Sequence, residues 1–521
     1  MIKGIALGCA VSLLAGCSAL SSGQGVTGSV FDTSQFPSVQ SGSQSSNQSS
    51  TSSTTAAQDT TETTVTRNTS TEIETLSFPN MPDTTPDGTG TLYNGSADVS
   101  ITASGTYTFS GTFSDTTITV NVDKDADDGV VYLVLDGVSM TSDSGTPIYI
   151  IEAKDVVIVL ADGSENTIYQ GAVTTTEEDF PSGAIYTKAD TVITGSGSLS
   201  VNTLYNDAIN ARDDLIIDGA SIIIDAVSDG IVAQDLLAIQ EADLRITAGK
   251  DGLKTTNTED EDKGDLIITS GTYSIAAEGD GISAERTLQI DGGSFIITSG
   301  GGYTGVLNTI TVGEGSSQTQ ATDLLETSMK GLKANDILIN GGGIDISSYE
   351  DGIKAENTIV MNGGTVYLLI GDDGMTADNA LTINDGVITI EYGYEGIEGD
   401  YLSIHGGEIS VTVLDDGINA GSSAGLIYIT GGNIFIASQG DCIDSNGDLT
   451  IEGGEIVFDS NAIYTGGDGE IDVSGTTTIT GGTLVDTNGN EVSASSSGSG
   501  MQSFFSTPSR QSTQTQNNQR R

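Results

Sequence analysis

A short phrase returns through the chain at steps close to 22 residues, and it constrains the fold more than any other feature. Two neighbouring copies are Asp351-Gly352-Ile353 and Asp373-Gly374-Met375. The copies begin at Asp207, Asp229, Asp251, Asp280, Lys330, Asp351, Asp373, Glu395, Asp416 and Asp441. A fixed period of this length is typical of a repeat architecture in which each unit contacts only its neighbours.

Each repeat contains short runs of alternating apolar residues separated by glycine-rich turns. Examples are "LTINDGVITI" at 381–390 and "LSIHGGEISV" at 402–411. Strands this short suit one coil of a solenoid, in which every strand pairs with its equivalent in the next coil. The sequence therefore predicts an all-β parallel β-helix of about 22 residues per coil, with alternate aliphatic side chains pointing inward.

The composition divides the chain into four parts. Residues 1–17 have the pattern of a signal peptide, and residues 18–88 are Ser/Thr-rich and predict a flexible tether. Residues 89–493 form the expected β-helix, with an N-terminal cap and first coils at 97–182. Residues 494–521 form a polar tail that we expect to be disordered.

The end of the signal peptide, Leu14-Ala15-Gly16-Cys17, resembles a bacterial lipobox. This resemblance implies cleavage before Cys17 and attachment of lipid to its sulfur. It predicts an exported protein anchored by lipid alone, at the outer membrane or cell surface. The alternative is an ordinary secretory signal. Cys442 is then the one cysteine of the exported domain besides Cys17, so no intrachain disulfide is expected there, and we expect Cys442 to be a small buried hydrophobe.

The charge balance excludes one class of partner. The chain has 72 acidic and 17 basic residues, for a formal net charge of −55. Such a protein repels nucleic acid. The acidic excess either keeps the protein soluble or binds divalent cations, and the positions of the acids decide between the two.

In a β-helix the repeated acids form a stack with one member per coil, about 4.8 Å apart. We call the acidic residues that begin the phrase the acidic column. One interpretation is that each carboxylate accepts hydrogen bonds from backbone N–H groups of its turn. The other is that carboxylates of adjacent coils bind Ca²⁺, which prefers six to eight oxygen ligands. A single histidine, His405, argues against zinc or copper.

The candidate calcium ligands include column members and the acids that directly precede two of them. They are Asp229, Asp251, Asp280, Asp351, Asp372, Asp373, Asp415, Asp416 and Asp441. The double acids Asp372/Asp373 and Asp415/Asp416 are the preferred pairs.

Basic residues gather beside the column. Lys254, Lys333 and Lys354 each follow a column position by three residues, on the outward side of the expected strand, and Lys250 and Lys330 lie nearby. They either form salt bridges with the column or help Ca²⁺ to bind a ligand that carries a carboxylate. Two longer steps in the repeat require insertions, at 255–264 and within 300–329, and the second is long enough for an extra coil or a lid.

These residues resemble a known family. The "DDGI" repeats, the "GLKA" phrase at 331–334 and the block "VYLVLDGVSM" at 131–140 are similar to those of bacterial carbohydrate-binding β-helix proteins, typified by a clostridial cellulose- and pectate-binding protein. The resemblance covers about residues 97–460. It implies a right-handed helix, bound calcium, binding of cellulose or acidic sugars, and kinship with family 9 polysaccharide lyases. Lys330 and Glu395 depart from the pattern.

Three functions remain open. The first is a non-catalytic, monomeric surface lipoprotein that binds an acidic or cellulosic polysaccharide with Ca²⁺. The second is a lyase that cleaves uronates by β-elimination with Ca²⁺ and Lys254, Lys333 or Lys354 as base. The third is a structural envelope protein or adhesin. Because the chain has no tryptophan, the expected sugar-stacking candidates are Tyr303, Tyr349, Tyr392, Tyr394 and Tyr401.

Overall fold

The computed structural model describes residues 73–494, except 87, 89, 96, 176–179, 306–326 and 460–468. The predicted signal peptide with Cys17, the predicted tether up to residue 72 and the predicted tail after residue 494 lie outside the described residues, so these expectations stay predictions. Within those ranges every regular element is a β-strand, and there is no helix that could cross a membrane.

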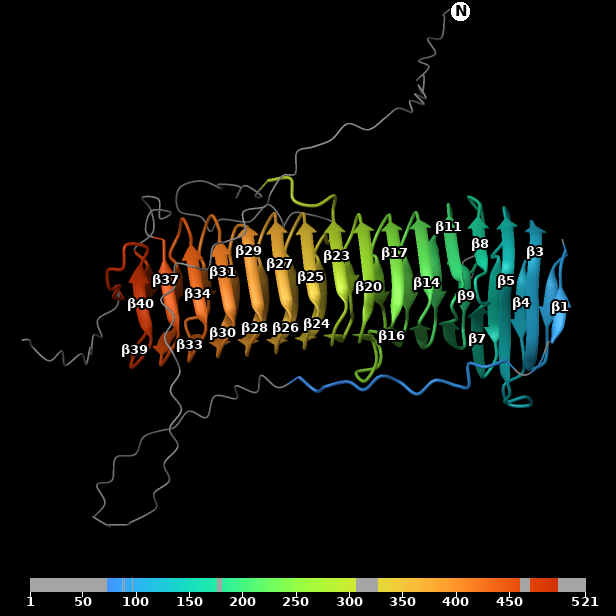
Figure 1. The fold of residues 1–521 in the computed structure, drawn as a ribbon, viewed down its shortest axis with the longest axis horizontal. Helices are drawn as coiled ribbons and strands as arrows, with labels where there is room; N and C mark the ends of the chain where they lie inside the picture. Colours follow the sequence, from blue (N-terminus) through green and yellow to red (C-terminus); the bar gives the residue numbers. More distant parts are fainter. Residues whose placement is uncertain are drawn as a thin grey trace, which may run out of the picture. The chain divides into compact units, whose positions relative to one another are not determined.

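The strands form three parallel sheets that wind together as a solenoid (Figure 1). The first sheet contains β2 (Val99–Ile101), β4 (Ile118–Asn121), β6 (Ile148–Glu152), β9 (Gly183–Thr187), β12 (Asp207–Ala211), β15 (Ile231–Ala233), β18 (Leu253–Thr255), β21 (Ile282–Ser283), β32 (Ile418–Ala420), β35 (Ile443–Ser445) and β38 (Ile471–Val473).

Four strands run continuously from the first sheet into the second, because the corner between the two sheets is only a bulge or a bend there. They are β24 (Leu332–Ile339), β26 (Ile353–Met361), β28 (Met375–Ile383) and β30 (Ile397–Ile404). The second sheet also contains β1 (Thr91–Tyr93), β3 (Gly105–Ser114), β5 (Val130–Ser142), β7 (Asp155–Leu160), β10 (Asp190–Thr194), β13 (Leu215–Asp218), β16 (Leu236–Gln240), β19 (Asp265–Ile268), β22 (Thr287–Ile290), β33 (Leu426–Ile429), β36 (Asp448–Ile451) and β39 (Thr477–Ile479).

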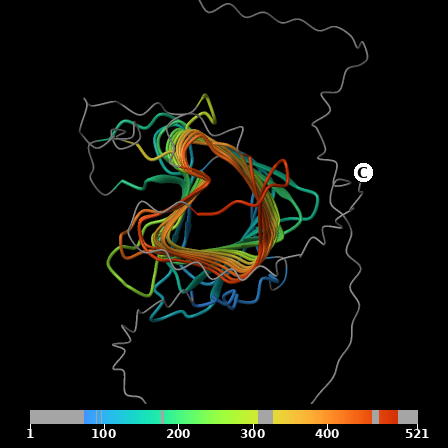
Figure 2. The same ribbon diagram turned by 90° about the vertical axis from the view of Figure 1, so that its left-hand side faces the viewer.

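The third sheet follows the glycine turn of each repeat. It contains β8 (Glu165–Gln170), β11 (Ser198–Thr203), β14 (Ser221–Ala226), β17 (Ala242–Ala248), β20 (Gly271–Ala277), β23 (Ser294–Ser299), β25 (Gly343–Ser348), β27 (Thr365–Ile370), β29 (Val387–Tyr392), β31 (Glu408–Thr412), β34 (Asn433–Ala437), β37 (Glu455–Phe458) and β40 (Thr483–Asp486). Viewed along the axis, the coils lie over one another around a common interior (Figure 2).

The predicted parallel β-helix and its register are confirmed. The aliphatic residue two places after each column position pairs with its equivalent in the next coil, as in Ile209↔Ile231 and Ile353↔Met375. These inward side chains are fully buried and belong to one continuous core. Cys442 is also fully buried in that core, as expected. The strands at 97–182 pair in the same parallel manner, so the expected cap consists of coils of the solenoid.

Two parts of the structure differ from the sequence-based expectation. Residues 73–86, expected as the end of the tether, pack on the second sheet. Phe78 and Met81 contact its outer apolar cluster, and Gln289 exchanges two hydrogen bonds with the backbone of Leu76. The physical reason is that this short segment concentrates four large apolar side chains, at Ile73, Leu76, Phe78 and Met81, which can pack on the apolar face of the sheet.

The 300–329 insertion adds no coil to the solenoid. Ile282 pairs directly with Leu332, and Phe295 pairs directly with Ile344. Since neighbouring strands lie about 4.8 Å apart, no strand fits between these pairs. The middle of the insertion, 306–326, lies outside the described residues, so the expected lid stays a prediction.

Eight of the ten copies of the phrase have a glycine after the column position, where the coils approach closely, while the first and last copies have Ala208 and Cys442 there. A Cβ placed on Gly374 would lie 2.4 Å from the carbonyl oxygen of Gly396 and 2.4 Å from Cδ1 of Ile390. The same conflict recurs along the series, for example between Gly352 and the carbonyl oxygen of Gly374 at 2.7 Å. A side chain at Gly374 would therefore require the two coils to move apart.

We therefore expect Gly374→Ala to destabilise the protein by about 1–3 kcal/mol, the usual cost of overpacking. Gly343→Ala is the matched control, because nothing lies within 4 Å of a Cβ placed there. Urea unfolding followed by circular dichroism measures both. Equal stability of the two variants would contradict the close-approach argument.

Candidate functional site

The acidic column forms a hydrogen-bonded ladder along the edge of the first sheet. The Oδ1 atom of each column aspartate accepts a hydrogen bond from the backbone N–H of the equivalent residue in the next coil, and Lys330 and Glu395 interrupt this series. The backbone N–H of Asp229 donates to Asp207 at 3.1 Å. In the same way the N–H of Asp251 donates to Asp229 at 2.9 Å, and the N–H of Asp280 donates to Asp251 at 2.8 Å. The ladder continues at Asp373 to Asp351 (3.4 Å), Glu395 to Asp373 (3.2 Å) and Asp441 to Asp416 (2.7 Å).

This ladder confirms that the column binds backbone N–H groups, with one correction. The donor belongs to the next coil and not to the acid's own turn, because the coils stack in register. One carboxylate oxygen of each of these acids is used in this way. The second oxygen remains for other partners, which differ between the two halves of the column.

Lysine compensates the column in its N-terminal half. Lys254 Nζ lies 2.6 Å from Oδ2 of Asp251. Lys330, which replaces an acid in the column, places its ammonium 3.0 Å from Glu350 and 3.4 Å from Asp351. Lys330 therefore places a half-buried positive charge where the repeat would otherwise place another carboxylate.

The C-terminal half has a different charge balance. Asp351, Asp372 and Asp373 are all buried, and they offer carboxylate oxygens that lie within 4.8 Å of one another. Burial and the charges of neighbouring acids, Asp372 first, raise the pKa of Asp373 well above its usual range. This cluster brings together three of the candidate ligands.

The following two coils continue this concentration of acid. Burial and the charge of Glu398 raise the pKa of Glu395. Burial, partly offset by the hydrogen bond from the backbone of Asp441, raises the pKa of Asp416 to about 7. Carboxylates resist ionisation in this half because their charges are concentrated in a desolvated place. The excess of carboxylates over basic side chains in this half matches the preference of Ca²⁺ for oxygen ligands.

Two further acidic clusters were not predicted. Asp441, a candidate, groups with Asp444 and Asp472, and a separate group consists of Asp190, Asp213 and Asp214. Asp444 lies three residues after the column position Asp441, and lysines occupy the equivalent position in other coils. This spacing is the sequence signal that could have identified Asp444 as part of a cluster. The second group lies outside the repeated phrase and gives no periodic signal.

The three candidate base lysines lie in one outward row of the first sheet, as predicted. Lys333 and Lys354 are direct neighbours across strands, while Ser283 separates Lys254 from Lys333. Lys354 forms an ion pair with Asp378, outside the column.

The environment of these lysines favours the charged form. Burial, the largest single effect, would lower the pKa of Lys254, but the charges of Asp251 and other nearby acids together outweigh it and the pKa is raised. The pKa of Lys354 is likewise raised, because its hydrogen bond to Asp378 and the charges of nearby acids together outweigh burial. A general base at neutral pH needs the opposite shift.

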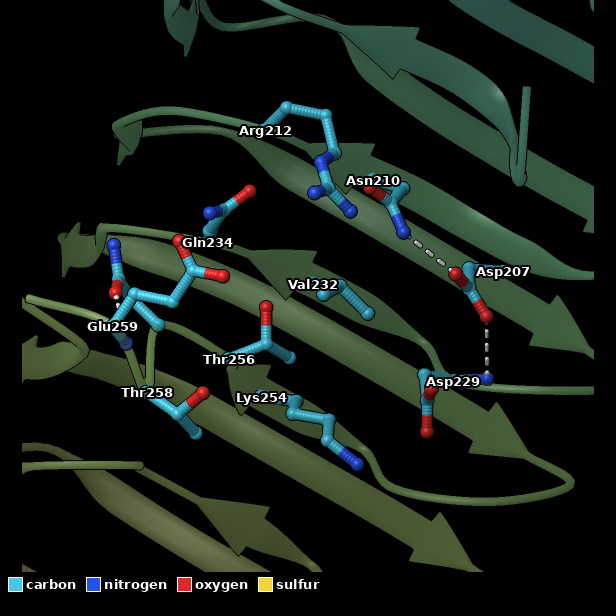
Figure 3. Close-up of a pocket in the computed structure, with 11 residues that line it drawn as sticks. Asp207, Asn210, Arg212, Asp229, Val232, Gln234, Lys254, Thr256, Thr258 and Glu259 are labelled. Atoms are coloured by element: carbon cyan, nitrogen blue, oxygen red, sulfur yellow. Dashed lines mark hydrogen bonds between the residues drawn. The ribbon is translucent and has the colours of Figure 1, made fainter. Parts of the chain in front are cut away.

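A polar pocket of about 420 Å³ opens where the predicted 255–264 insertion leaves the first sheet (Figure 3). Strand β12 contributes Asp207 and Asn210, and β18 contributes Lys254. The insertion contributes Thr256 to Glu259. Of the candidate ligands, the pocket includes Asp229.

The expected tyrosine platforms do not form one surface row. Tyr303 and Tyr392 contact each other edge to face, with ring centroids 5.8 Å apart. The side chain of Tyr394 is hydrogen-bonded to Asp415. Tyr349 and Tyr401 are half-buried.

The fold and this stacked acidic face define a solenoid protein of the parallel β-helix class, with an extended polar surface along its axis. The chain belongs to the family of carbohydrate-binding domain-containing proteins, whose model matches residues 95–374 and 371–507.

One curated relative and one solved structure extend this comparison. The chain is 39% identical over 132 residues to a carbohydrate-binding domain-containing protein of Acetivibrio thermocellus, which covers 25% of this chain and 45% of that relative's length. A gadolinium derivative of a polysaccharide lyase-like protein from C. thermocellum has 34% sequence identity. It covers 40% of this chain and 90% of that chain, with a TM-score of 0.38.

The ladder gives a prediction about stability. We expect Asp251→Ala to cost about 1–3 kcal/mol, because it leaves the N–H of Asp280 buried without its acceptor. Asp251→Asn is the control, since it keeps an acceptor oxygen and should lose only the partly buried ion pair with Lys254, about 1 kcal/mol. Urea unfolding of both variants tests this, and equal losses would contradict a role of the ladder.

Proposed function

We propose that the protein is a calcium-dependent carbohydrate-binding lipoprotein that holds polysaccharide on the face of the β-helix beside the acidic column. The polysaccharide is an acidic, pectate-like glycan or cellulose. The lipid on Cys17 anchors the protein to the outer membrane or cell surface, and the tether lets the folded domain extend from it. Family membership supports carbohydrate as the ligand class.

The observation that carries the calcium part is the buried cluster of Asp351, Asp372 and Asp373. These residues would hold the ion through their carboxylate oxygens, with Asp415 and Asp416 contributing in the neighbouring coils. A bound divalent cation would add positive charge to a cluster in which Asp351 is already paired with Lys330. It compensates the column and provides a contact for the carboxylates of an acidic glycan.

The chain's own residues would orient the glycan. Column carboxylates are fixed by the backbone ladder, so they need little reorganisation when a ligand binds. The row with Lys333 and Lys354 lies on the outward side of the same strands and gives a second set of cationic contacts. A linear polymer along the axis could contact successive coils in the same way.

Binding, rather than cleavage, is supported by the two ion-paired lysines. The raised pKa values of Lys254 and Lys354 favour a structural or ligand-binding role over proton abstraction.

A pull-down with polygalacturonate and with cellulose, in Ca²⁺ and in chelator, tests the proposal. We expect retention only in Ca²⁺ and no increase in ultraviolet absorbance from unsaturated product. Product formation would support the lyase, and retention of neither polymer would support an envelope protein or adhesin.

The calcium ligands are tested by the double variant Asp372→Asn/Asp373→Asn. We expect calcium affinity to fall by at least about tenfold, because two charged ligands are lost while their shape is retained. Asp385→Asn, an exposed turn acid of the same solenoid, is the control. Isothermal titration calorimetry measures both, and an unchanged affinity in the double variant would exclude this cluster.

The raised pKa values predict an unusual dependence of stability on pH. The pKa of Asp416 is about 7 in the folded protein against an ordinary 3.8, so the native state binds the proton more tightly than the unfolded state. Its stabilising contribution is present below the ordinary pKa and is lost as pH rises through about 7. In chelator we expect the melting temperature to fall by at least about 2 °C between about pH 5 and pH 8.

Added Ca²⁺ should remove most of this fall, because the ion stabilises the ionised carboxylates. Differential scanning fluorimetry at a series of pH values measures both effects. A melting temperature that rises with pH in chelator would contradict the electrostatic account of the column.

A further inference from the structure

The outward row of the first sheet continues beyond the lysines toward the N-terminal coils. Its members pair in register from strand to strand, in the order Tyr149, Tyr186, Asn210, Val232 and Lys254. The residues on either side of each tyrosine point inward and are fully buried, while both tyrosines are half-buried. The row therefore brings two aromatic side chains to the strands next to the pocket.

The two tyrosines form a compact aromatic pair. Their ring centroids lie 5.9 Å apart with 59° between the ring planes. In a chain without tryptophan, paired tyrosines at the surface provide rigid, amphipathic contact area at low entropic cost. The apolar C–H face of a pyranose ring is complementary to such a surface.

The adjoining pocket provides groups that suit a sugar unit. Asn210 donates a hydrogen bond from Nδ2 to Asp207 at 2.8 Å, while its buried Oδ1 has no partner among the described residues. Val232 lies between Asn210 and Lys254 in the row and gives the pocket an apolar patch. Polar groups around a small apolar surface are typical of sites that fix the orientation of a ligand.

One cation in this pocket remains available to a ligand. Lys254 is paired with Asp251 at 2.6 Å. Arg212 is exposed, points over the same pocket in Figure 3, and forms no ion pair within the described ranges. A guanidinium binds a carboxylate through two parallel hydrogen bonds, so Arg212 is suited to a uronate unit.

We propose that the Tyr149–Tyr186 pair and the pocket form one glycan subsite, in which a pyranose ring packs on the tyrosines and a neighbouring uronate places its carboxylate on Arg212. The glycan chain then runs along the helix axis, since the tyrosines and the pocket lie on successive strands about 4.8 Å apart. This subsite rests on the proposed function. It places the contact at the N-terminal coils, away from the Asp351/Asp372/Asp373 cluster.

Calorimetric titration of the full folded chain in Ca²⁺ tests the subsite, with an oligogalacturonate and a cello-oligosaccharide as probes. We expect Tyr149→Ala/Tyr186→Ala to weaken oligogalacturonate binding by at least about tenfold, the loss of aromatic stacking. Tyr169→Ala is the matched control, because Tyr169 is also half-buried but lies on β8 of the third sheet. Melting curves confirm that each variant is folded.

Arg212→Gln separates the carboxylate contact from general weakening. We expect it to weaken oligogalacturonate by about tenfold and to leave cello-oligosaccharide affinity within about twofold. Unchanged binding by the folded tyrosine double variant would overturn the subsite, and equal losses for both probes in Arg212→Gln would overturn the carboxylate assignment. Failure of the unaltered protein to bind either probe would instead overturn the proposed function on which the subsite rests.

Discussion

The structure depends on direct stacking of one coil on the next, with backbone hydrogen bonds running parallel to the axis. This stacking favours a glycine in most copies of the phrase, because the carbonyl oxygen of the next coil lies close to the place of a side chain. It also brings equivalent residues of successive coils to about the same 4.8 Å spacing, whatever their chemistry. The acidic column is therefore a consequence of the fold, and its charge has to be compensated within the fold.

Hydrogen bonds and lysines compensate part of this charge, and raised pKa values limit the ionisation of the rest. At every column aspartate one carboxylate oxygen accepts a hydrogen bond from a backbone N–H of the next coil, as Asp251 does for Asp280, and the exceptions are the steps after Lys330 and Glu395. Lys254 and Lys330 add positive charge in the N-terminal half. The half around Asp373 and Asp416 keeps its acids close together and desolvated, with raised pKa values. A divalent cation is the remaining compensation that we propose for that half.

The fold could be predicted from the sequence because a single periodic phrase specifies both the architecture and the register. The pairing Ile282↔Leu332 shows that even a step of 50 residues was aligned correctly from the phrase alone. The stacking of the candidate ligands followed from the same alignment. The partners of each carboxylate did not, since hydrogen bonds to the next coil and the ion pair of Lys354 with Asp378 depend on side-chain geometry.

Features that do not belong to the repeated phrase could not be predicted from it. Tyr149 belongs to an early coil whose length differs from 22 residues, so nothing in the phrase aligns it with Tyr186 and Asn210. The Asp190, Asp213 and Asp214 group comes from corners of the solenoid and not from its repeated positions. The packing of residues 73–86 depends on a few apolar side chains in a polar stretch.

The most direct test of this account is a count of calcium on the purified folded domain by mass spectrometry, after dialysis against Ca²⁺ near neutral pH and after removal of free ion. The account predicts at least about one ion per chain that a strong chelator removes, with a lower melting temperature as the result. A chain that retains no calcium and melts at the same temperature with and without chelator would contradict it.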